Sequence, residues 1–382
     1  MVAKFTNDEY TLSIAVSSGL EKVAKKELFR LGYPESPALN VKIEVKGSLI
    51  DIARLNVFLR TAERVYIKLA EFDATSFDEL FDGVSKIPFE NFIESSGKII
   101  VNGKCVKSKI YAISACQKIV KKAVTKRLCD KYSVNFLSET GSEYEIVFSI
   151  FKDRAEILLN TTGVALHKRG YKNKVWIAPI KETLASAIVL MSDYYYNRPL
   201  ADPFCGSGTI PIEASLIALN IAPGKNREFA FDKWKGFDKN LKKRVIEEAL
   251  DKEELSRKIE VYGTDIDKKA IELAKYHAKN AGLEDRISFK TRPVKEFKTD
   301  SDIGTIICNP PYGERVYDRQ EAETCYQELG VATNKLLGWS KFIITSAKNF
   351  EKKFGNKADR ERKLYNSEKE CRLYYYYGKK GD

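Results

Sequence analysis

Two prolines follow an asparagine in the segment Asn309-Pro310-Pro311-Tyr312, directly after the apolar run GTIIC. Proline fixes φ and biases the preceding residue toward extended geometry, so the Asn309 side chain and the Pro310 carbonyl can converge on one point. Two oxygens at one point suit a planar NH₂ group, because each accepts one N–H and the nitrogen lone pair faces an electrophile. Tyr312 adds a ring on which an extruded base could stack. The segment therefore indicates transfer of a group to an exocyclic amine.

A glycine-rich turn follows another predicted strand, PLADPF, farther upstream. This strand delivers Asp202 and Phe204 to the turn Cys205-Gly206-Ser207-Gly208, and a helix is expected from Thr209 onward. Such a turn lets a ligand approach backbone amides closely. The turn lacks the GxGxxG spacing of a dinucleotide site and the GK[ST] ending of a P-loop. We therefore expect a cofactor that presents no pyrophosphate.

An acidic residue ends the next predicted strand, KIEVYGTD. Asp265 can accept both hydroxyls of a ribose there, and Ile266 can lie against an adenine ring. The alternative role, an N-cap for the following helix, is served by Asp267 as well. Ligands of open α/β sheets bind beyond the carboxyl ends of the strands, so Asp202, Asp265 and Asn309 are expected at one shared site.

The elements that position these residues alternate from about residue 180 onward. Amphipathic helices separate the predicted strands PLADPF, KIEVYGTD, RISFK, GTIICNP and KFIITSA. This alternation predicts a parallel, doubly wound sheet, and ERKLYNSEKECRLYYYYG predicts a closing antiparallel hairpin. Residues 224–240 stand out as a long irregular insertion. We assign residues 181–382 to a Rossmann-like α/β domain.

The first part of the chain has a different pattern. Residues 1–65 begin as strand, helix, strand and helix, which predicts a small α+β unit. Residues 66–165 add strands at VYIKLAEF and KIIVNGKCVKS, two helices, and the hairpin EYEIVFSIFKDRAEILLNTT. A basic and aromatic linker, residues 166–180, then leads to the Rossmann-like domain.

Positive charge is concentrated in the second of these zones. The chain has a net charge of +12, and ten Lys and Arg residues between Lys98 and Lys131 face one acid, Asp130. A solvated helix face is the alternative, but the near absence of acids favours contact with a nucleic acid. We expect such contacts at eight basic residues: Lys118, Lys121, Lys122, Lys126, Arg127, Lys168, Arg169 and Lys172.

The bulk composition, 43% hydrophobic and 31% charged, is ordinary for a soluble globular protein. No apolar run approaches the roughly 20 residues that span a bilayer, and the first residues do not form a signal peptide. We therefore expect a cytoplasmic protein with no membrane partner. Seven scattered cysteines without a CxxC pair, and only two histidines, indicate no metal site.

DPFCGSGTIPIE (202–213) together with NPPYGER (309–315) resembles the motifs of class I S-adenosylmethionine-dependent RNA methyltransferases with an N-terminal THUMP domain. The resemblance covers nearly the whole chain, including a ferredoxin-like start, and is strongest to bacterial enzymes that make N2-methylguanine in large-subunit ribosomal RNA. It implies S-adenosylmethionine, with S-adenosylhomocysteine as product, in a pocket formed by Asp202, Phe204, Gly206, Gly208 and Asp265. Family members often add an acid that binds the adenine amine. Here Arg292 and Pro293 occupy that stretch, which leaves adenine recognition unassigned.

The sequence thus predicts methylation of guanine N2 in structured RNA, most simply 23S rRNA, with protein partners unknown. Methylation of adenine N6 in RNA or DNA stays an alternative, because NPPY serves any exocyclic amine. A non-catalytic RNA-binding or ribosome-assembly protein is a second class, which the intact glycine turn and Asp265 disfavour. A nicotinamide dehydrogenase is disfavoured by the missing GxGxxG and by the positions of His167 and His277, in the linker and in a helix.

Overall fold

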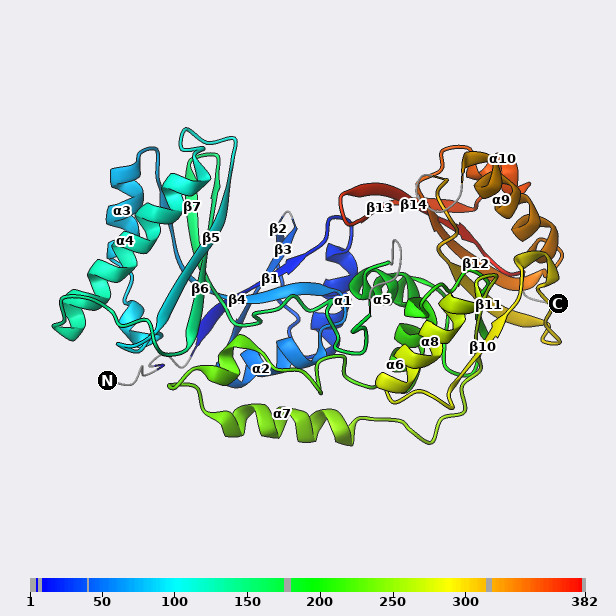
Figure 1. The fold of residues 1–382 in the computed structure, drawn as a ribbon, viewed down its shortest axis with the longest axis horizontal. Helices are drawn as coiled ribbons and strands as arrows, with labels where there is room; N and C mark the ends of the chain where they lie inside the picture. The colour runs from blue at the N-terminus through cyan, green and yellow to red at the C-terminus, as the bar shows by residue number, and fades with distance from the viewer. Residues whose placement is uncertain (1–4, 6–8, 40, 175–179, 314–317, 380–382) are drawn as a thin grey trace.

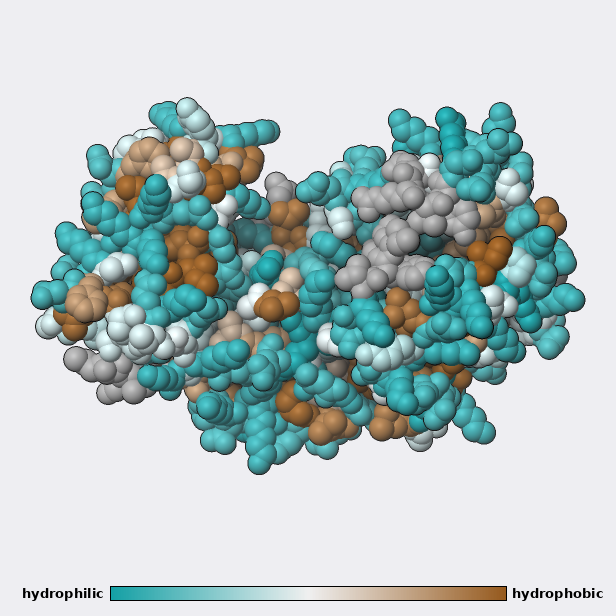
Figure 2. All heavy atoms as spheres, viewed as in Figure 1, coloured by the Kyte–Doolittle hydropathy of each residue, from teal (hydrophilic) through white to brown (hydrophobic). Residues whose placement is uncertain are grey.

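The computed structural model describes residues 5, 9–39, 41–174, 180–313 and 318–379. These residues form two seven-stranded sheets that lie one after the other along the long axis of the molecule (Figure 1). The face shown in Figure 2 is mostly hydrophilic and is hollowed between the two lobes. None of the helices in these ranges has the length and apolar character that crossing a lipid bilayer requires.

The first sheet has the strand order β2-β3-β1-β4-β7-β6-β5. Its strands are β1 (Tyr10–Val16), β2 (Ala38–Leu39), β3 (Lys42–Gly47), β4 (Ala62–Asp73), β5 (Lys98–Val106), β6 (Glu143–Phe151) and β7 (Arg154–Asn160). The long strand β4 pairs with β1 along its first half and with β7 along its second half. Both amino-terminal zones therefore share one sheet, and the predicted boundary between residues 65 and 66 falls inside β4.

Four helices cover this sheet. They are α1 (Glu21–Arg30), α2 (Leu49–Phe58), α3 (Phe77–Ser85) and α4 (Ile113–Tyr132). Helix α4 buries an apolar stripe at Cys116, Val120, Ala123, Val124 and Leu128. This spacing of three and four residues is the pattern of an amphipathic helix, and it turns the basic side chains of α4 away from the core.

The second sheet has the order β10-β9-β8-β11-β12-β14-β13. Its strands are β8 (Leu200–Asp202), β9 (Val261–Asp265), β10 (Ile287–Thr291), β11 (Ile303–Cys308), β12 (Gly338–Thr345), β13 (Arg360–Asn366) and β14 (Lys369–Tyr376). Strands β10, β9, β8, β11 and β12 run parallel, and β14 and β13 close the sheet as an antiparallel hairpin. The predicted Rossmann-like sheet with a closing hairpin is confirmed.

The remaining described elements are helices and 3-10 turns of the second half of the chain, together with one 3-10 turn of the first lobe. They are α5 (Glu182–Met191), α6 (Thr209–Ala218), α7 (Lys239–Asp251), α8 (Lys268–Asn280), α9 (Arg319–Thr333), α10 (Phe350–Phe354), η1 (Phe89–Asn91, in the first lobe), η2 (Ala230–Lys233) and η3 (Val294–Glu296). The sequence did not predict α7, which lies beneath α2 in Figure 1. It begins at an N-cap, Asp238, whose carboxylate accepts from the backbone N–H of Asn240.

The predicted insertion, residues 224–240, contains η2 and leads into α7, and this part of the chain completes the core of the first lobe. Trp234 is 1% exposed and stacks on Tyr144 of β6, with ring centroids 5.2 Å apart. Its indole N–H donates to the carbonyl of Glu143 at 3.2 Å. Arg54 of α2 pairs with Glu248 of α7 at 2.5 Å. A segment from the second half of the sequence therefore fastens the two lobes together.

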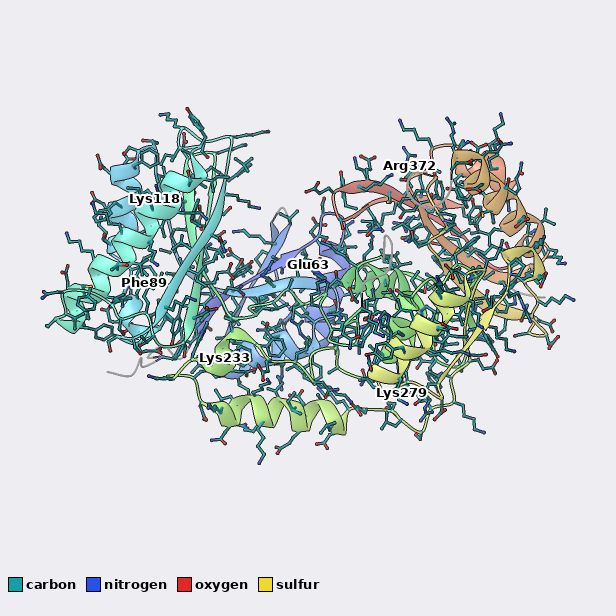
Figure 3. The ribbon with its side chains drawn as sticks, viewed as in Figure 1. Glu63, Phe89, Lys118, Lys233, Lys279 and Arg372 are labelled. Atoms are coloured by element: carbon teal, nitrogen blue, oxygen red, sulfur yellow. The ribbon has the colours of Figure 1, made fainter. Side chains whose placement is uncertain are left out.

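A half-buried carboxylate marks the junction of the lobes. Glu63 of β4 lies midway along the molecule, between Phe89 and Lys279 (Figure 3). It accepts hydrogen bonds from Ser17 Oγ and Thr183 Oγ1, each at 3.0 Å, and its Oε2 lies 3.1 Å from His167 Nδ1. Burial alone would raise the pKa of Glu63, but these partners and the charge of nearby Lys181 hold it at about 2.

Candidate active site

Three strands of the second sheet end side by side at one edge. The central strand β8 ends at Asp202, and it pairs in parallel with β9 on one side and β11 on the other. Strand β9 ends at Asp265, and Asn309 directly follows the last residue of β11. Because parallel strands present their carboxyl ends at the same edge, the structure brings all three predicted residues together there.

The glycine turn is tied directly to the acid of the neighbouring strand. Gly206 donates its backbone N–H to Asp265 Oδ2 at 3.0 Å, and Asp267 donates its own to Oδ1 at 3.0 Å. A carboxylate offers about four lone-pair sites, so these bonds leave acceptor capacity for two further hydroxyl donors. Asp267 also caps α8 by accepting from Lys269 N at 2.7 Å. The N-cap role thus falls to Asp267, and Asp265 remains available to a ligand.

Gly208 ends the turn in a left-handed conformation, with a φ of +84°. A Cβ atom at this position would lie 3.0 Å from Ala274 Cβ and 3.1 Å from Phe289 Cζ, so a larger residue would strain both backbone and packing. Thr209, the next residue, begins α6 and is buried. Within the turn, only Gly206 is partly accessible to solvent.

Asp202 and Asp265 differ in their access to solvent. Asp202 is 2% exposed; burial raises the pKa of its carboxyl well above its usual range, although the Phe204 N–H donates to Oδ1 at 3.0 Å. Burial also raises the pKa of Asp265, which stays partly accessible. Beside it, Ile266 is 61% exposed. An accessible acid next to an exposed apolar side chain suits a ribose joined to a flat base.

The segment after β11 holds Asn309 in a defined orientation. Pro310 is buried, and the Pro311 carbonyl accepts from Tyr326 Oη at 2.6 Å. Tyr312 donates its phenol to Asn309 Oδ1 at 2.7 Å. The ring of Tyr312 packs partly against the core of the second sheet, so only part of it faces solvent. Glu314 and Arg315, the end of the NPPYGER motif, lie outside the described residues.

Two residues near this segment were missed by the sequence analysis. Cys371 of β14 lies 3.5 Å from Tyr312 Oη, and the Lys369 ammonium lies 5.3 Å from the centroid of the Tyr312 ring. Cys371 is 59 residues away from Tyr312 in sequence. No local pattern signals such a contact, because it depends on how the closing hairpin packs on the sheet.

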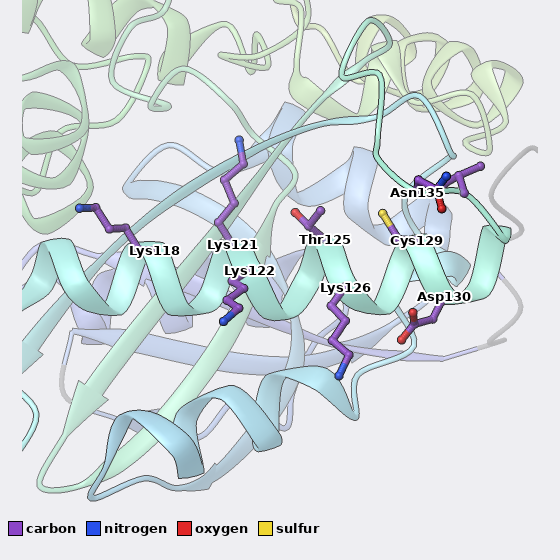
Figure 4. Close-up of a pocket in the computed structure, with 9 residues that line it drawn as sticks. Lys118, Lys121, Lys122, Thr125, Lys126, Cys129, Asp130 and Asn135 are labelled. Carbon is purple, nitrogen blue, oxygen red and sulfur yellow. The ribbon is translucent and has the colours of Figure 1, made fainter.

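Helix α4 carries a separate, open depression of about 660 Å³, far from the strand-end site (Figure 4). Lys118 and Lys121 extend from one side of α4, whereas Lys122 and Lys126 extend from the other, toward α3. The ammonium groups of Lys122 and Lys126 lie 5.8 and 5.9 Å from the ring centroid of Phe81 on α3. Lys121 pairs with Glu139 at 2.9 Å. This surface is basic and solvent-accessible.

Three of the predicted nucleic-acid contacts are bonded to protein groups in the structure. Arg127 forms a two-pronged ion pair with Glu90, with bonds of 3.0 and 2.5 Å. Arg169 is 6% exposed and donates to the carbonyls of Leu166 and Arg60, so it cannot reach a polyanion. Its burial follows from partners that the sequence pattern does not reveal.

Lys172 is the third of these. Its ammonium donates to the Ile180 carbonyl at 3.3 Å and lies 3.4 Å from Glu182. Of the three basic linker residues that we expected to bind, only Lys168 is exposed. Residues 175–179 of the predicted linker lie outside the described residues. Over the ranges that the structure describes, no group of three or more His, Cys, Asp or Glu side chains could hold a metal ion.

The strand-end site thus combines a partly accessible carboxylate, an exposed apolar side chain and a carboxamide oxygen held by Tyr312. Residues 169–375, more than half of the chain, match the family model described as an RMKL-like methyltransferase domain. The chain belongs to this methyltransferase family. Residues 11–66 match an RlmL ferredoxin-like domain and residues 74–160 match a THUMP domain, so the resemblance stated from the motifs is confirmed.

Relatives of known sequence agree with this assignment. A Bacillus subtilis protein named "Putative RNA methyltransferase YpsC" is 42% identical over 97% of this chain and 97% of its own length. The ribosomal RNA large subunit methyltransferase K/L of Syntrophotalea carbinolica is 32% identical over 93% of this chain. The match covers 52% of that longer enzyme, so the chain spans about half of the K/L proteins.

Solved structures share the whole architecture. SMU.472, described as "a putative methyltransferase complexed with SAH", is 39% identical with a TM-score of 0.94, covering 99% of this chain and 100% of its own. A Listeria monocytogenes protein described as a "predicted N6-adenine-specific DNA methylase" is 42% identical with a TM-score of 0.93, covering 97% of each chain. The names of these relatives agree on methyl transfer and differ in the substrate, RNA in one case and DNA in another.

Proposed function

We propose that this chain transfers a methyl group from S-adenosylmethionine to the exocyclic N2 amine of a guanine in structured RNA, with 23S rRNA as the substrate. The observation that carries the proposal is the strand-end geometry. Asn309 lies at the same sheet edge as Asp265 and the glycine turn, with its carboxamide oxygen fixed by Tyr312. A cofactor and a target amine can therefore meet at one point.

The residues at the edge fit an adenosyl cofactor. Asp265 would accept the ribose hydroxyls with its remaining lone pairs, and the exposed Ile266 would pack on the adenine. Asp202, Phe204, Gly206, Gly208 and Thr209 would shape the pocket around the amino acid end. The Arg292 N–H already donates to the Asp265 carbonyl at 2.9 Å, so this amide does not recognise the adenine. When bound, S-adenosylmethionine supplies an electrophilic methyl group.

The protein itself needs only to position the amine. Asn309 Oδ1 and the Pro310 carbonyl would each accept one N–H, which leaves the nitrogen lone pair directed at the methyl group. Part of the Tyr312 ring stays accessible for stacking on an extruded base. No strongly basic group is required before attack, because the proton can pass to water afterwards. Catalysis would rest on positioning and desolvation.

RNA is favoured as substrate over DNA by three observations. A THUMP domain model matches residues 74–160, the K/L relatives are named for ribosomal RNA of the large subunit, and α4 presents an accessible basic surface. Double-stranded RNA is read largely by shape and by phosphate contacts, which suits a surface of exposed lysines.

Adenine N6 is the second candidate for the target amine. The Listeria structure is described as an adenine-specific DNA methylase, and the Asn309 geometry serves any exocyclic amine. Guanine N2 is preferred because the motifs, read with the THUMP-like region, most resemble enzymes that make N2-methylguanine.

Mass spectrometry of rRNA nucleosides from a deletion strain tests the proposal. We expect a reduction of N2-methylguanine in 23S rRNA, its restoration by the wild-type gene, and no restoration by an Asn309→Ala gene. Loss of N6-methyladenine with unchanged N2-methylguanine would replace the first candidate by the second. No change in any methylated nucleoside of RNA or DNA would contradict both.

A further inference from the structure

The closing hairpin of the second sheet reaches the phenol of Tyr312. Cys371 of β14 is 1% exposed and donates its thiol to Tyr312 Oη at 3.5 Å. On the ring itself, the Lys369 ammonium lies 5.3 Å from the centroid. Residues of the hairpin therefore surround a side chain of the candidate catalytic segment.

These contacts settle the direction of the phenol hydrogen bond. A tyrosine hydroxyl carries one proton to donate and two lone pairs to accept with. The Cys371 thiol donates to one of these lone pairs, so the phenol proton is directed at Asn309 Oδ1, 2.7 Å away. The thiol can also donate to the Lys369 carbonyl at 3.7 Å, but the phenol oxygen is nearer.

The direction of this bond decides whether the oxygen or the NH₂ group of the Asn309 carboxamide faces Tyr312. In the flipped orientation, the phenol O–H would face the Asn309 NH₂ group and would lose the acceptor that it has in the structure. Burial makes such an unpaired donor costly, about 1–3 kcal/mol. The carboxamide oxygen has two lone pairs, and Tyr312 occupies one, so the second can accept an N–H from a substrate.

We infer that Tyr312 and Cys371 are positioning residues that hold the Asn309 carboxamide with its oxygen, not its NH₂ group, toward the target amine. The inference rests on the proposed function and adds to it a role for the closing hairpin. It separates two contributions of Tyr312: the ring can stack on the base, whereas the hydroxyl acts through Asn309.

Tyr312→Phe tests the hydroxyl while it keeps the ring. The assay uses the full chain, S-adenosylmethionine with a tritiated methyl group, and total RNA from the deletion strain as acceptor. We expect kcat to fall about five- to tenfold, the loss typical of one hydrogen bond, with the Kd of S-adenosylmethionine by calorimetry within twofold. An unchanged or higher kcat would overturn the inference, since the phenol would then be neutral or would compete with the substrate for Asn309.

Cys371 variants test the relay, by which we mean the chain of hydrogen bonds from Cys371 through the Tyr312 hydroxyl to Asn309. Cys371→Ala should lower kcat about two- to threefold, and Cys371→Ser should restore it, because a hydroxyl donates where a methyl group cannot. Cys116→Ala removes a buried thiol from the core of the first lobe and should leave kcat unchanged. If Cys371 has only a structural role, its substitution should lower the melting temperature, and the Cys371→Ala and Cys371→Ser variants should have the same kcat. That result would contradict the relay.

A double-mutant cycle gives the sharpest readout. In the Tyr312→Phe background the thiol has no hydroxyl to act on, so Cys371→Ala should cause no further loss of kcat. If the fold-losses in kcat of the two single variants multiply in the double variant, the two residues act independently and the relay is overturned. The proposed function fails separately: wild-type protein that binds S-adenosylmethionine but labels no RNA would sink that proposal, and this inference with it. If the wild-type protein is active and Tyr312→Phe has the same kcat, the inference is contradicted and the proposed function is not.

Discussion

The strand-end site and the surface of α4 hold their functional side chains in opposite ways. At the strand ends, backbone N–H groups and buried partners fix each polar atom, as the bonds of Gly206 to Asp265 and of Tyr312 to Asn309 show. On α4, Lys122 and Lys126 are exposed and rest on an aromatic ring. One region presents single atoms in fixed places, and the other presents a diffuse positive charge.

This difference predicts two kinds of mutational response. A displaced atom at the strand ends cannot be replaced by a neighbour, so single substitutions there should have large effects that depend little on salt. Exposed charges act together and are screened over a Debye length of about 8 Å at physiological ionic strength. The effects of substitutions on α4 on RNA affinity should therefore be individually small, cumulative and salt-dependent.

Asn309→Ala should produce the largest effect. It removes one of the two oxygens proposed to orient the amine, and loss of a comparable preorganised group costs about a hundred- to a thousandfold in kcat. Cofactor affinity by calorimetry should stay within a few-fold, because Asn309 orients the acceptor. A large loss of cofactor binding with a smaller change in kcat would show that Asn309 belongs to the cofactor site instead.

Asp265→Asn should come next. Replacing a charged acceptor of two hydroxyls should weaken S-adenosylmethionine binding about ten- to a hundredfold. The matched control Asp267→Asn, two residues away, keeps the cap on α8 and should change affinity by less than twofold. Equal losses in both variants would point to helix α8 rather than the ribose. Because burial raises the pKa of Asp265, wild-type affinity should also weaken as the pH falls through this raised pKa.

Glu63→Gln probes the junction between the two lobes. The pKa of Glu63 is about 2 in the folded chain against an ordinary value of 4.5, so its charge stabilises the fold above pH 4.5. This stabilisation, about 3 kcal/mol, should be lost as the pH falls from 4.5 toward 2. Urea unfolding at pH 7 and pH 3 should therefore show that the difference in the free energy of unfolding between wild type and variant is smaller at pH 3. The exposed Glu272→Gln should show no such difference at either pH.

The sequence was sufficient for the features that local pattern determines. The strands before Asp202, Asp265 and Asn309 could be read from short apolar runs, and the parallel order of such strands places their ends together. Helix α7 was missed because its buried stripe is narrow: Val245 and Ala249 are its only fully buried residues among those described. A charged segment with so few apolar positions looks like a loop.

Contacts between distant segments could not be predicted. Arg169 looks like a surface residue in a basic linker, yet it is buried, and it contacts Arg60 and Glu213 from two distant segments of the chain. The hydrogen bond between Cys371 and Tyr312 likewise depends on the packing of the hairpin. In both cases the decisive partner is set by tertiary structure, which composition and periodicity do not encode.

The smallest effect per residue is expected on α4. Reversing Lys118, Lys122 and Lys126 to Glu should weaken RNA binding about tenfold at moderate salt, and each lost phosphate contact should lower the salt slope by about 1. At saturating RNA, kcat should stay within twofold, because the strand-end site is untouched. Reversal of Lys239, Lys243 and Arg244 on α7 is the matched control. If the α7 variant loses affinity and the α4 variant does not, the RNA binds at α7, and the diffuse charge of α4 is only a solvated face.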